Sequence, residues 1–225
     1  MLLKKHPKNI VDCESWYNAC PPKKGEKQWA DGRSAKELAK YMTENLPLVP
    51  AEIEKSINAI IPANAEFDWD AEYVTKLPGA GEGRNHDAVL FNKETVITIE
   101  AKADETLGNL IEEEIENASV NKLCRICNLL EYFFKGGFKD YKNLRYQLLT
   151  ASAGTLIEAQ NRNCKTAVFI VLVFKSNGKV TEEKVTANHK DVEAFLKATS
   201  AYKESDLYVI PNNTDVKLYF KEIVL

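Results

Sequence analysis

Hydrophobic and polar residues alternate through residues 95–102, which is the pattern of a half-buried β-strand. Side chains two residues apart point the same way along a strand, so Glu100 and Lys102 would share one face. Ile97 and Ile99 would lie on the opposite, apolar face and pack on a core. The pattern therefore predicts a strand that leaves its polar face free for chemistry.

A second strand is predicted over residues 85–91, close enough to form a hairpin with the first. A turn at Asn92-Lys93 would place Asp87 opposite Thr98, whereas a turn at Lys93-Glu94 would place it opposite Glu100. Both registers place Asp87 on the Glu100 face, whereas a slip of one residue would send it to the other face.

Two carboxylates and a lysine would then meet on this hairpin. Carboxylates opposed at about 5 Å repel each other, and a hard cation relieves the repulsion by taking both as oxygen ligands. Asp87, Glu100 and Lys102 are therefore candidate catalytic residues with Mg²⁺ (or Mn²⁺) as the cofactor. The competing interpretation is an exposed strand face whose charges only solvate the protein.

The hydrophobic pattern of the rest of the chain places helices before and after the hairpin. We expect further strands at residues 66–74, 167–174, 207–210 and 216–225. We expect helices starting near Ser34 and near Pro50, and helices over residues 143–160 and 191–198. The apolar run 167–174 suits a buried central strand, and it is far too short to cross a membrane.

This order of elements, with its Asp and Glu-x-Lys strands, resembles the PD-(D/E)XK nuclease superfamily over roughly residues 66–175. The resemblance implies an α/β fold with a restriction endonuclease-like mixed central sheet flanked by helices, here with N-terminal helical decoration. It also implies that Asp87 and Glu100 hold the metal and that Lys102 orients or activates the attacking water. His86 departs from the pattern, because many members have proline there.

The chain is similar, over most of its length, to one uncharacterised group of bacterial proteins within that superfamily. The residues that carry this similarity are Trp29, Gly32, residues 34–39, Glu72, and residues 77–79, 100–105, 145–149 and 157–159. The similarity supplies a fold and a candidate site, but it does not supply a substrate.

Three further residues have predicted roles, of which the first two follow from the superfamily resemblance and the third from the chemistry of its side chain. Members often carry another acidic ligand before the Asp strand, and Glu72 is our prediction for it, with Glu54 as the alternative. Gln147 is predicted to support the lysine or the substrate backbone, and Arg145 is predicted to bind a nucleic-acid phosphate bidentately. For each residue, solvation at the surface is the competing interpretation.

Length and composition fit one domain, since 225 residues with 44% hydrophobic content can bury a sizeable core. We divide it into an N-terminal helical part (1–62), a nuclease-like core (63–175) and a C-terminal helix with strands (176–225). The formal charge of −3 is no signature of a nucleic-acid binder. Residues 1–40 hold nine Lys/Arg against five Asp/Glu, which could contact phosphates or form a solvated tail.

Other motifs have structural explanations. No second pair of cysteines or histidines is spaced to complete a zinc site with Cys124 and Cys127. We therefore expect these two cysteines to be buried helix residues and expect no zinc. Five cysteines without a secretory signal indicate reduced thiols and a cytoplasmic protein. Residues 34–37 have the form of a capping box, which explains Glu37 structurally. Residues 79–83 precede a strand, so they predict a flexible connection near a groove, and no nucleotide site.

The sequence supports two hypotheses about function. The first is a metal-dependent nuclease that hydrolyses phosphodiester bonds of DNA or RNA, with nucleic acid as the partner. The second is a catalytically inactive nuclease-fold module that binds nucleic acid or a protein, motivated by the low net charge and by an acidic run after the site. That run comprises Asp104, Glu105, residues 112–114 and Glu116. The oligomeric state stays open, a homodimer included.

Overall fold

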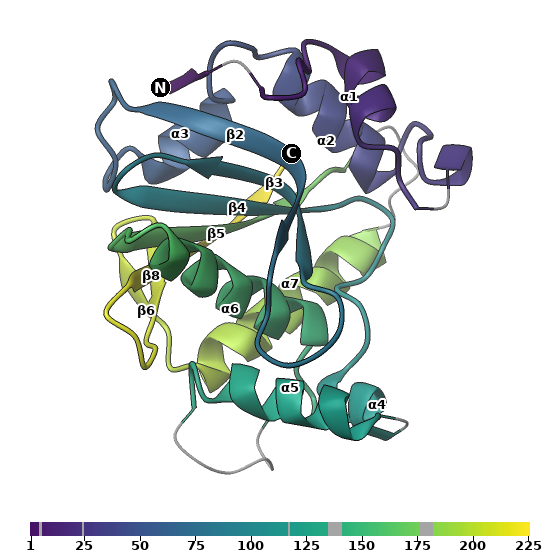
Figure 1. The fold of residues 1–225 in the computed structure, drawn as a ribbon, viewed down its shortest axis with the longest axis vertical. Helices are drawn as coiled ribbons and strands as arrows, with labels where there is room; N and C mark the ends of the chain where they lie inside the picture. Colours follow the sequence, from purple (N-terminus) through teal and green to yellow (C-terminus); the bar gives the residue numbers. More distant parts are fainter. Residues whose placement is uncertain (5, 24, 117, 135–140, 176–181) are drawn as a thin grey trace.

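The computed structural model describes the chain except residues 5, 24, 117, 135–140 and 176–181 (Figure 1). The described strands form one eight-stranded mixed sheet in the order β1-β2-β3-β4-β5-β8-β7-β6. Their bounds are β1 Leu2–Leu3, β2 Glu66–Thr75, β3 Arg84–Phe91, β4 Thr95–Lys102, β5 Thr166–Val173, β6 Tyr202–Glu204, β7 Leu207–Ile210 and β8 Lys217–Val224. The predicted mixed α/β sheet flanked by helices is confirmed.

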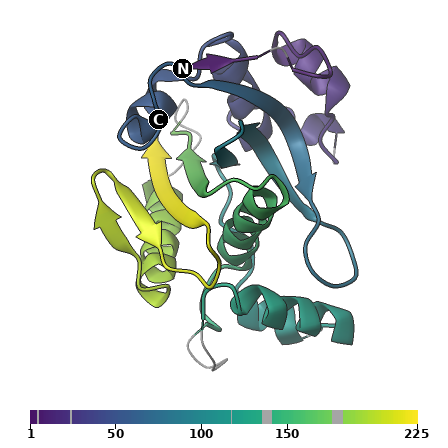
Figure 2. The same cartoon turned by 60° about the vertical axis from the view of Figure 1, so that its left-hand side comes forward.

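The sheet combines parallel and antiparallel strand pairs. β2, β3 and β4 form an antiparallel meander, β4, β5 and β8 run parallel, and β7 and β6 return antiparallel at the far edge. β1 adds to β2 in parallel, so the N-terminal part contributes a strand as well as the predicted helices. Figure 2 shows the edge formed by β6, β7 and β8 with α7 beside it.

Helices cover both faces of the sheet (Figure 1). The first layer comprises α1 Cys13–Ala19, α2 Ser34–Thr43 and α3 Ala51–Ile57. The second layer comprises α4 Ile111–Glu116, α5 Val120–Leu130, α6 Tyr146–Asn161 and α7 Glu182–Ala198. The segment from α4 to α6 makes the crossover that parallel β4 and β5 require.

The central strands β4 and β5 are buried on both faces, as the apolar run 167–174 predicts. Ile170 of β5 packs with the first helical layer, whereas Phe169 packs with the second. α6 is buried along almost its whole length because it lies between the sheet and α5. Across the described parts of the chain, none of the helices combines the length and apolar character that crossing a bilayer requires.

Two local predictions are wrong in whole or in part. Ser34 is not a capping residue, because Arg33 is the N-cap of α2 and the Ser34 hydroxyl hydrogen-bonds Glu105 instead. Glu37 does accept a backbone N–H at the helix start, at 2.7 Å from Gly32. Cys124 and Cys127 lie on a helix but are exposed, because Ile126, Leu129 and Leu130 form its buried stripe.

Two predicted helix starts also shift. α6 begins at Tyr146, and not at 143, because the preceding residue Arg145 bridges to Leu110 in an extended conformation. The helix predicted over 191–198 is the C-terminal part of the longer α7. The start near Pro50 is confirmed, with Pro50 as the N-cap of α3.

Candidate functional site

β4 presents Glu100 and Lys102 to the α6 side of the sheet, as its alternation predicts. Thr98 on the same face contacts Thr155 of α6, with 2.6 Å between the hydroxyl oxygens. The Lys102 Nζ lies 2.8 Å from Glu100 Oε1, and the two side chains are only 7% and 6% exposed. The competing interpretation of an exposed, solvating strand face is therefore wrong for these residues.

The hairpin adopts the register in which the turn is centred on Lys93-Glu94. The pairing runs from Phe91 to Ala88, which lies opposite Ile99, and the same register continued by one residue sets Asp87 across from Glu100. Beyond Ala88 the two backbones part. The Ala101 N–H donates to Asp87 Oδ2 at 2.7 Å in place of a backbone acceptor on β3. Asp87 therefore lies in a fork between the two strands.

A kink in β2 accompanies this fork. Glu72 has a φ of +50°, a left-handed conformation that is strained for a residue with a side chain. Ala71, before the kink, packs with the first helical layer, whereas Tyr73, after it, hydrogen-bonds Glu158 of α6. The simple alternation of faces fails at this point of the strand.

β3 changes faces at the same level, because it pairs with β2 on both sides of Glu72. Ala88 packs with the first helical layer, but His86 packs against Gly154 of α6. The change also turns Arg84 toward the site, where its guanidinium contacts Glu100 Oε2. Sequence reasoning missed Arg84, because strict alternation puts residues 84 and 87 on opposite faces.

Burial and charge shape the protonation of the three carboxyl groups. Burial raises the pKa of Asp87 well above its ordinary value, and the charges of Glu100 and Glu72 add to that effect. Burial also raises the pKa of Glu72, although a hydrogen bond from Asn85 opposes it. Burial would raise the pKa of Glu100 too, but the charges of Arg84 and Lys102 outweigh it and lower the pKa.

Lys102 keeps its charge in this buried setting. Burial alone would lower the pKa of its ammonium group, but Glu100 and Asp87 together raise it above the ordinary value. The site therefore contains a permanent cation beside an ionised carboxylate, with two further carboxyl groups in electrostatic range.

The donor chemistry fits a hard divalent cation, since carboxylate oxygens are what Mg²⁺ and Mn²⁺ prefer. Within the described residues, however, no three His, Cys, Asp or Glu side chains are arranged to hold a metal ion as they stand. Each predicted ligand is engaged internally: Glu72 by Asn85, Asp87 by Ala101, and Glu100 by Arg84 and Lys102. Binding a metal would require these side chains to exchange partners.

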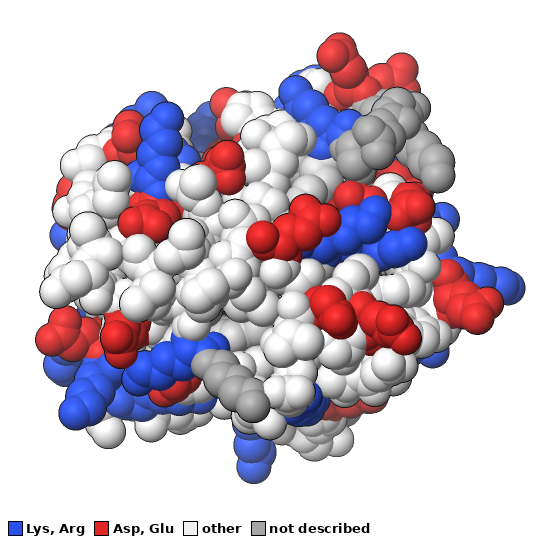
Figure 3. All heavy atoms as spheres, turned by 90° about the horizontal axis from the view of Figure 1, so that it is seen from above, with Lys and Arg blue, Asp and Glu red and all other residues white. Residues whose placement is uncertain are grey.

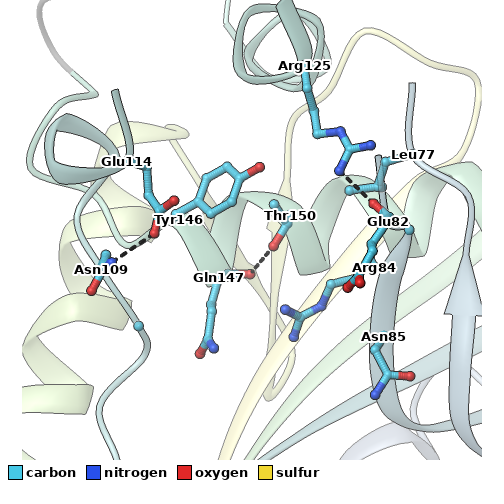
Figure 4. Close-up of a pocket in the computed structure, with 12 residues that line it drawn as sticks. Leu77, Glu82, Arg84, Asn85, Asn109, Glu114, Arg125, Tyr146, Gln147 and Thr150 are labelled. Carbon is cyan, nitrogen blue, oxygen red and sulfur yellow. Dashed lines mark hydrogen bonds between the residues drawn. The ribbon is translucent and has the colours of Figure 1, made fainter. Parts of the chain in front are cut away.

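A pocket of about 490 Å³ adjoins the site on the α6 side (Figure 4). Arg84 lines it from β3, Gln147 and Tyr146 from α6, and Arg125 from α5. A second pocket of about 400 Å³ shares Arg125 and Tyr146, so the hollow continues along α5. Gln147 thus shares this pocket with Arg84.

The glycine-rich segment 79–83 forms part of the pocket walls, which agrees with the predicted connection near a groove. Arg125 holds it from α5 by donating to the carbonyl oxygens of Ala80 (2.7 Å) and Glu82 (2.6 Å). Arg125 was not predicted as a site residue, because its position on a helix far along the chain carries no motif.

Two predicted residues are not brought to the site. Arg145 pairs with Asp191 of α7 at 2.8 Å and donates to the Gly108 carbonyl, and it does not line the pocket beside Arg84. Glu54 accepts a hydrogen bond of 2.9 Å from the Met1 amino group on the first helical layer. Of the two alternatives for a third acidic ligand, only Glu72 interacts electrostatically with Asp87.

Over the described part of the first helical layer, basic and acidic side chains alternate on the surface. Figure 3 shows Lys/Arg and Asp/Glu side chains intermixed on the face seen from above. Several N-terminal lysines are paired, including Lys4 with Asp68 and Lys40 with Asp31. The acidic residue Asp104 is likewise paired, with Arg33 at 2.8 Å.

The fold and site together define a mixed α/β protein with a buried carboxylate–lysine cluster at a forked hairpin. Comparison with protein families matches residues 9–224 to the family described as Domain of unknown function (DUF6946), and the chain belongs to that family. Neither the curated proteins nor the solved structures include a match to it.

Proposed function

We propose that this protein is a divalent-metal-dependent nuclease of restriction endonuclease-like fold, which hydrolyses phosphodiester bonds of DNA or RNA. The observation that carries the proposal is the meeting of Asp87, Glu100 and Lys102 in the fork between β3 and β4. A surface function would not require a lysine and two acids to be buried together, because burying charges is costly.

The arrangement of elements also supports the proposal. The resemblance noted in the sequence concerns an Asp strand, a Glu-x-Lys strand, helices and an apolar strand in that order. Here β3 and β4 are antiparallel neighbours, and a helical crossover leads to β5, which is parallel to β4. α6 of that crossover contributes Gln147 to the pocket beside the site.

In this proposal Asp87 and Glu100, with Glu72, hold Mg²⁺ or Mn²⁺, which when bound polarises the scissile phosphate and lowers the pKa of water. Lys102 stabilises the attacking hydroxide or the developing charge, because a fixed cation in a buried site needs no reorganisation during the reaction. Nucleic acid reaches the site through the pocket lined by Arg84, Arg125 and Gln147.

Cleavage of circular single-stranded and double-stranded DNA and of RNA, with Mg²⁺ or Mn²⁺, tests the proposal. Lys102→Met and Glu100→Gln each change one group at nearly constant volume. We expect each to lower metal-dependent cleavage by at least about a hundredfold, the scale of losing one preorganised electrostatic partner. Circular dichroism confirms that the variants are folded.

Lys217→Met is the matched control, because Lys217 pairs with Glu204 at 2.7 Å on the sheet edge away from the site. It should cleave like the wild type.

The alternative function, a catalytically inactive module that binds nucleic acid or a protein, is favoured by the engagement of both Glu100 oxygens. No cleavage of any substrate by the folded wild type, with nucleic-acid binding retained in Lys102→Met, would establish that alternative.

A further inference from the structure

Arg84 is a cation that contacts Glu100 at the edge of the pocket. Its guanidinium engages Oε2 of Glu100 while the Lys102 ammonium lies 2.8 Å from Oε1, so both oxygens of this carboxylate have cationic partners. A divalent cation bound through Glu100 must compete with one of them for an oxygen. When a metal binds, either Arg84 or Lys102 must therefore release its Glu100 oxygen.

Arg84 has room to move, whereas Lys102 has little. The Arg84 side chain is 12% exposed and lines the pocket of about 490 Å³, but Lys102 is not among the residues that line it. The Nε of Arg84 is buried and has no hydrogen-bond partner among the described residues. In this position one N–H donor of the guanidinium therefore has no acceptor among the described residues.

An acceptor for Arg84 is present in the same pocket. Gln147 Oε1 is buried and, within the described residues, accepts no hydrogen bond. A buried amide oxygen without a partner is destabilising, so a donor that reaches it gains a favourable contact. Figure 4 shows the Arg84 side chain extending from β3 toward the side of the pocket where Gln147 lies.

Charge balance favours the same exchange. As ligands of a bound divalent cation, Glu72, Asp87 and Glu100 would all be ionised, and set against Arg84 and Lys102 they would contribute one net negative charge. A divalent cation added to this set would leave one positive charge, whereas its addition with the withdrawal of Arg84 leaves none. A buried site is most stable when its charges balance.

We propose that Arg84 is an exchangeable cation: it neutralises Glu100 in the absence of metal, and it moves from Glu100 to Gln147 when a divalent cation binds. This inference rests on the proposed function, since it takes Asp87 and Glu100 as the metal ligands. It gives Arg84 and Gln147 positioning roles in metal binding. The metal-free arrangement is then a closed state of the site.

Mn²⁺ binding measured by isothermal titration calorimetry tests the exchange without any substrate. Arg84→Gln removes the competing cation and should bind Mn²⁺ about tenfold tighter or more than the wild type, the scale of a charge-assisted hydrogen bond. Arg84→Lys keeps the charge and should stay within about threefold of the wild type. Gln147→Leu removes the alternative acceptor and should weaken Mn²⁺ binding.

Arg162→Gln is the matched control, because Arg162 pairs with the buried Glu158 at 2.6 Å outside the site. It should leave Mn²⁺ affinity unchanged. If the wild type binds Mn²⁺, Glu100→Gln does not, and Arg84→Gln is no tighter, then the exchange is refuted while the metal site stands. If neither the wild type nor Arg84→Gln binds Mn²⁺, the proposed function itself is refuted.

A second measurement uses the wild type alone and does not depend on the folding of a variant. The Nε–Hε resonance of Arg84, assigned by NMR, should shift on titration with Mg²⁺, because the guanidinium leaves Glu100 for Gln147. An unchanged Arg84 resonance under Mg²⁺ that shifts the Asp87 and Glu100 amides would refute the exchange.

Discussion

His86 allows a quantitative test of how the site is built, because it stands where the resembling superfamily has proline and is only 1% exposed. Burial, with the nearby Arg84 charge, lowers the pKa of its imidazole from 6.5 to about 3. The ring is therefore neutral in the folded protein, while in the unfolded chain it gains a proton below about pH 6.5. The native state should thus lose stability relative to the unfolded state as the pH falls from 6.5 toward 3.

The magnitude follows from linkage. Between about pH 8 and pH 5 the free energy of unfolding should fall by about 2 kcal/mol through His86 alone, because each unit of pKa difference corresponds to about 1.4 kcal/mol. His86→Leu removes this titration. The difference in unfolding free energy between wild type and His86→Leu should therefore change by about 2 kcal/mol in favour of the variant over that range.

Urea unfolding of both proteins across this pH range provides the measurement, and the subtraction cancels other titrating groups that the substitution leaves unchanged. NMR titration of the ring protons gives a direct check. His189 is exposed and paired with Glu222, which raises its pKa, so it should titrate in the same experiment as an internal reference. A constant difference in unfolding free energy, with His86 titrating near 6.5, would refute a buried neutral imidazole and would make His86 a candidate for proton transfer.

Two further predictions concern the contact of α6 with the hairpin, and both can be measured by urea unfolding. Gly154→Ala places a Cβ 3.0 Å from His86 Nε2 and 3.2 Å from Arg84 Cγ; we expect a loss of about 1–3 kcal/mol from overpacking, larger than the helix-propensity gain of about 1 kcal/mol. A variant more stable than the wild type would show that the helix can shift freely. Thr155→Val leaves the Thr98 hydroxyl without its partner at 2.6 Å, and should cost about 1–3 kcal/mol. An unchanged free energy of unfolding would mean that this buried hydroxyl finds another partner.

The predicted register of the hairpin was open between two turns, and the turn residues themselves explain the outcome. The Asn92 side chain accepts hydrogen bonds from the backbone N–H groups of Glu94 and Thr95, both at 2.9 Å, which centres the turn on Lys93-Glu94. Asn side chains commonly stabilise turns in this way. The information that selects the turn was therefore local.

The faces of β2 and β3 were less predictable than those of β4. β4 is buried between two paired neighbours, so its alternation is regular and correctly assigned Glu100 and Lys102. β2 and β3 kink together at Glu72, and no glycine or proline lies at the kink to mark it. As a result, the sequence suggested Glu72 and Asp87 but missed Arg84. It also predicted a phosphate contact for Arg145, whose guanidinium instead pairs with Asp191 of α7.

By itself, the sequence determined the local and periodic features of this protein: the apolar central strand β5, the alternation of β4, the start of α3 at Pro50 and the presence of two acids and a lysine near one turn. These depend on residues close together in the chain. The tertiary structure alone decided that the acids and the lysine are buried, that Arg84 contacts Glu100, and that Arg125 and Gln147 share a pocket. Such features depend on packing between segments far apart in sequence, where a single kink changes which side chains meet.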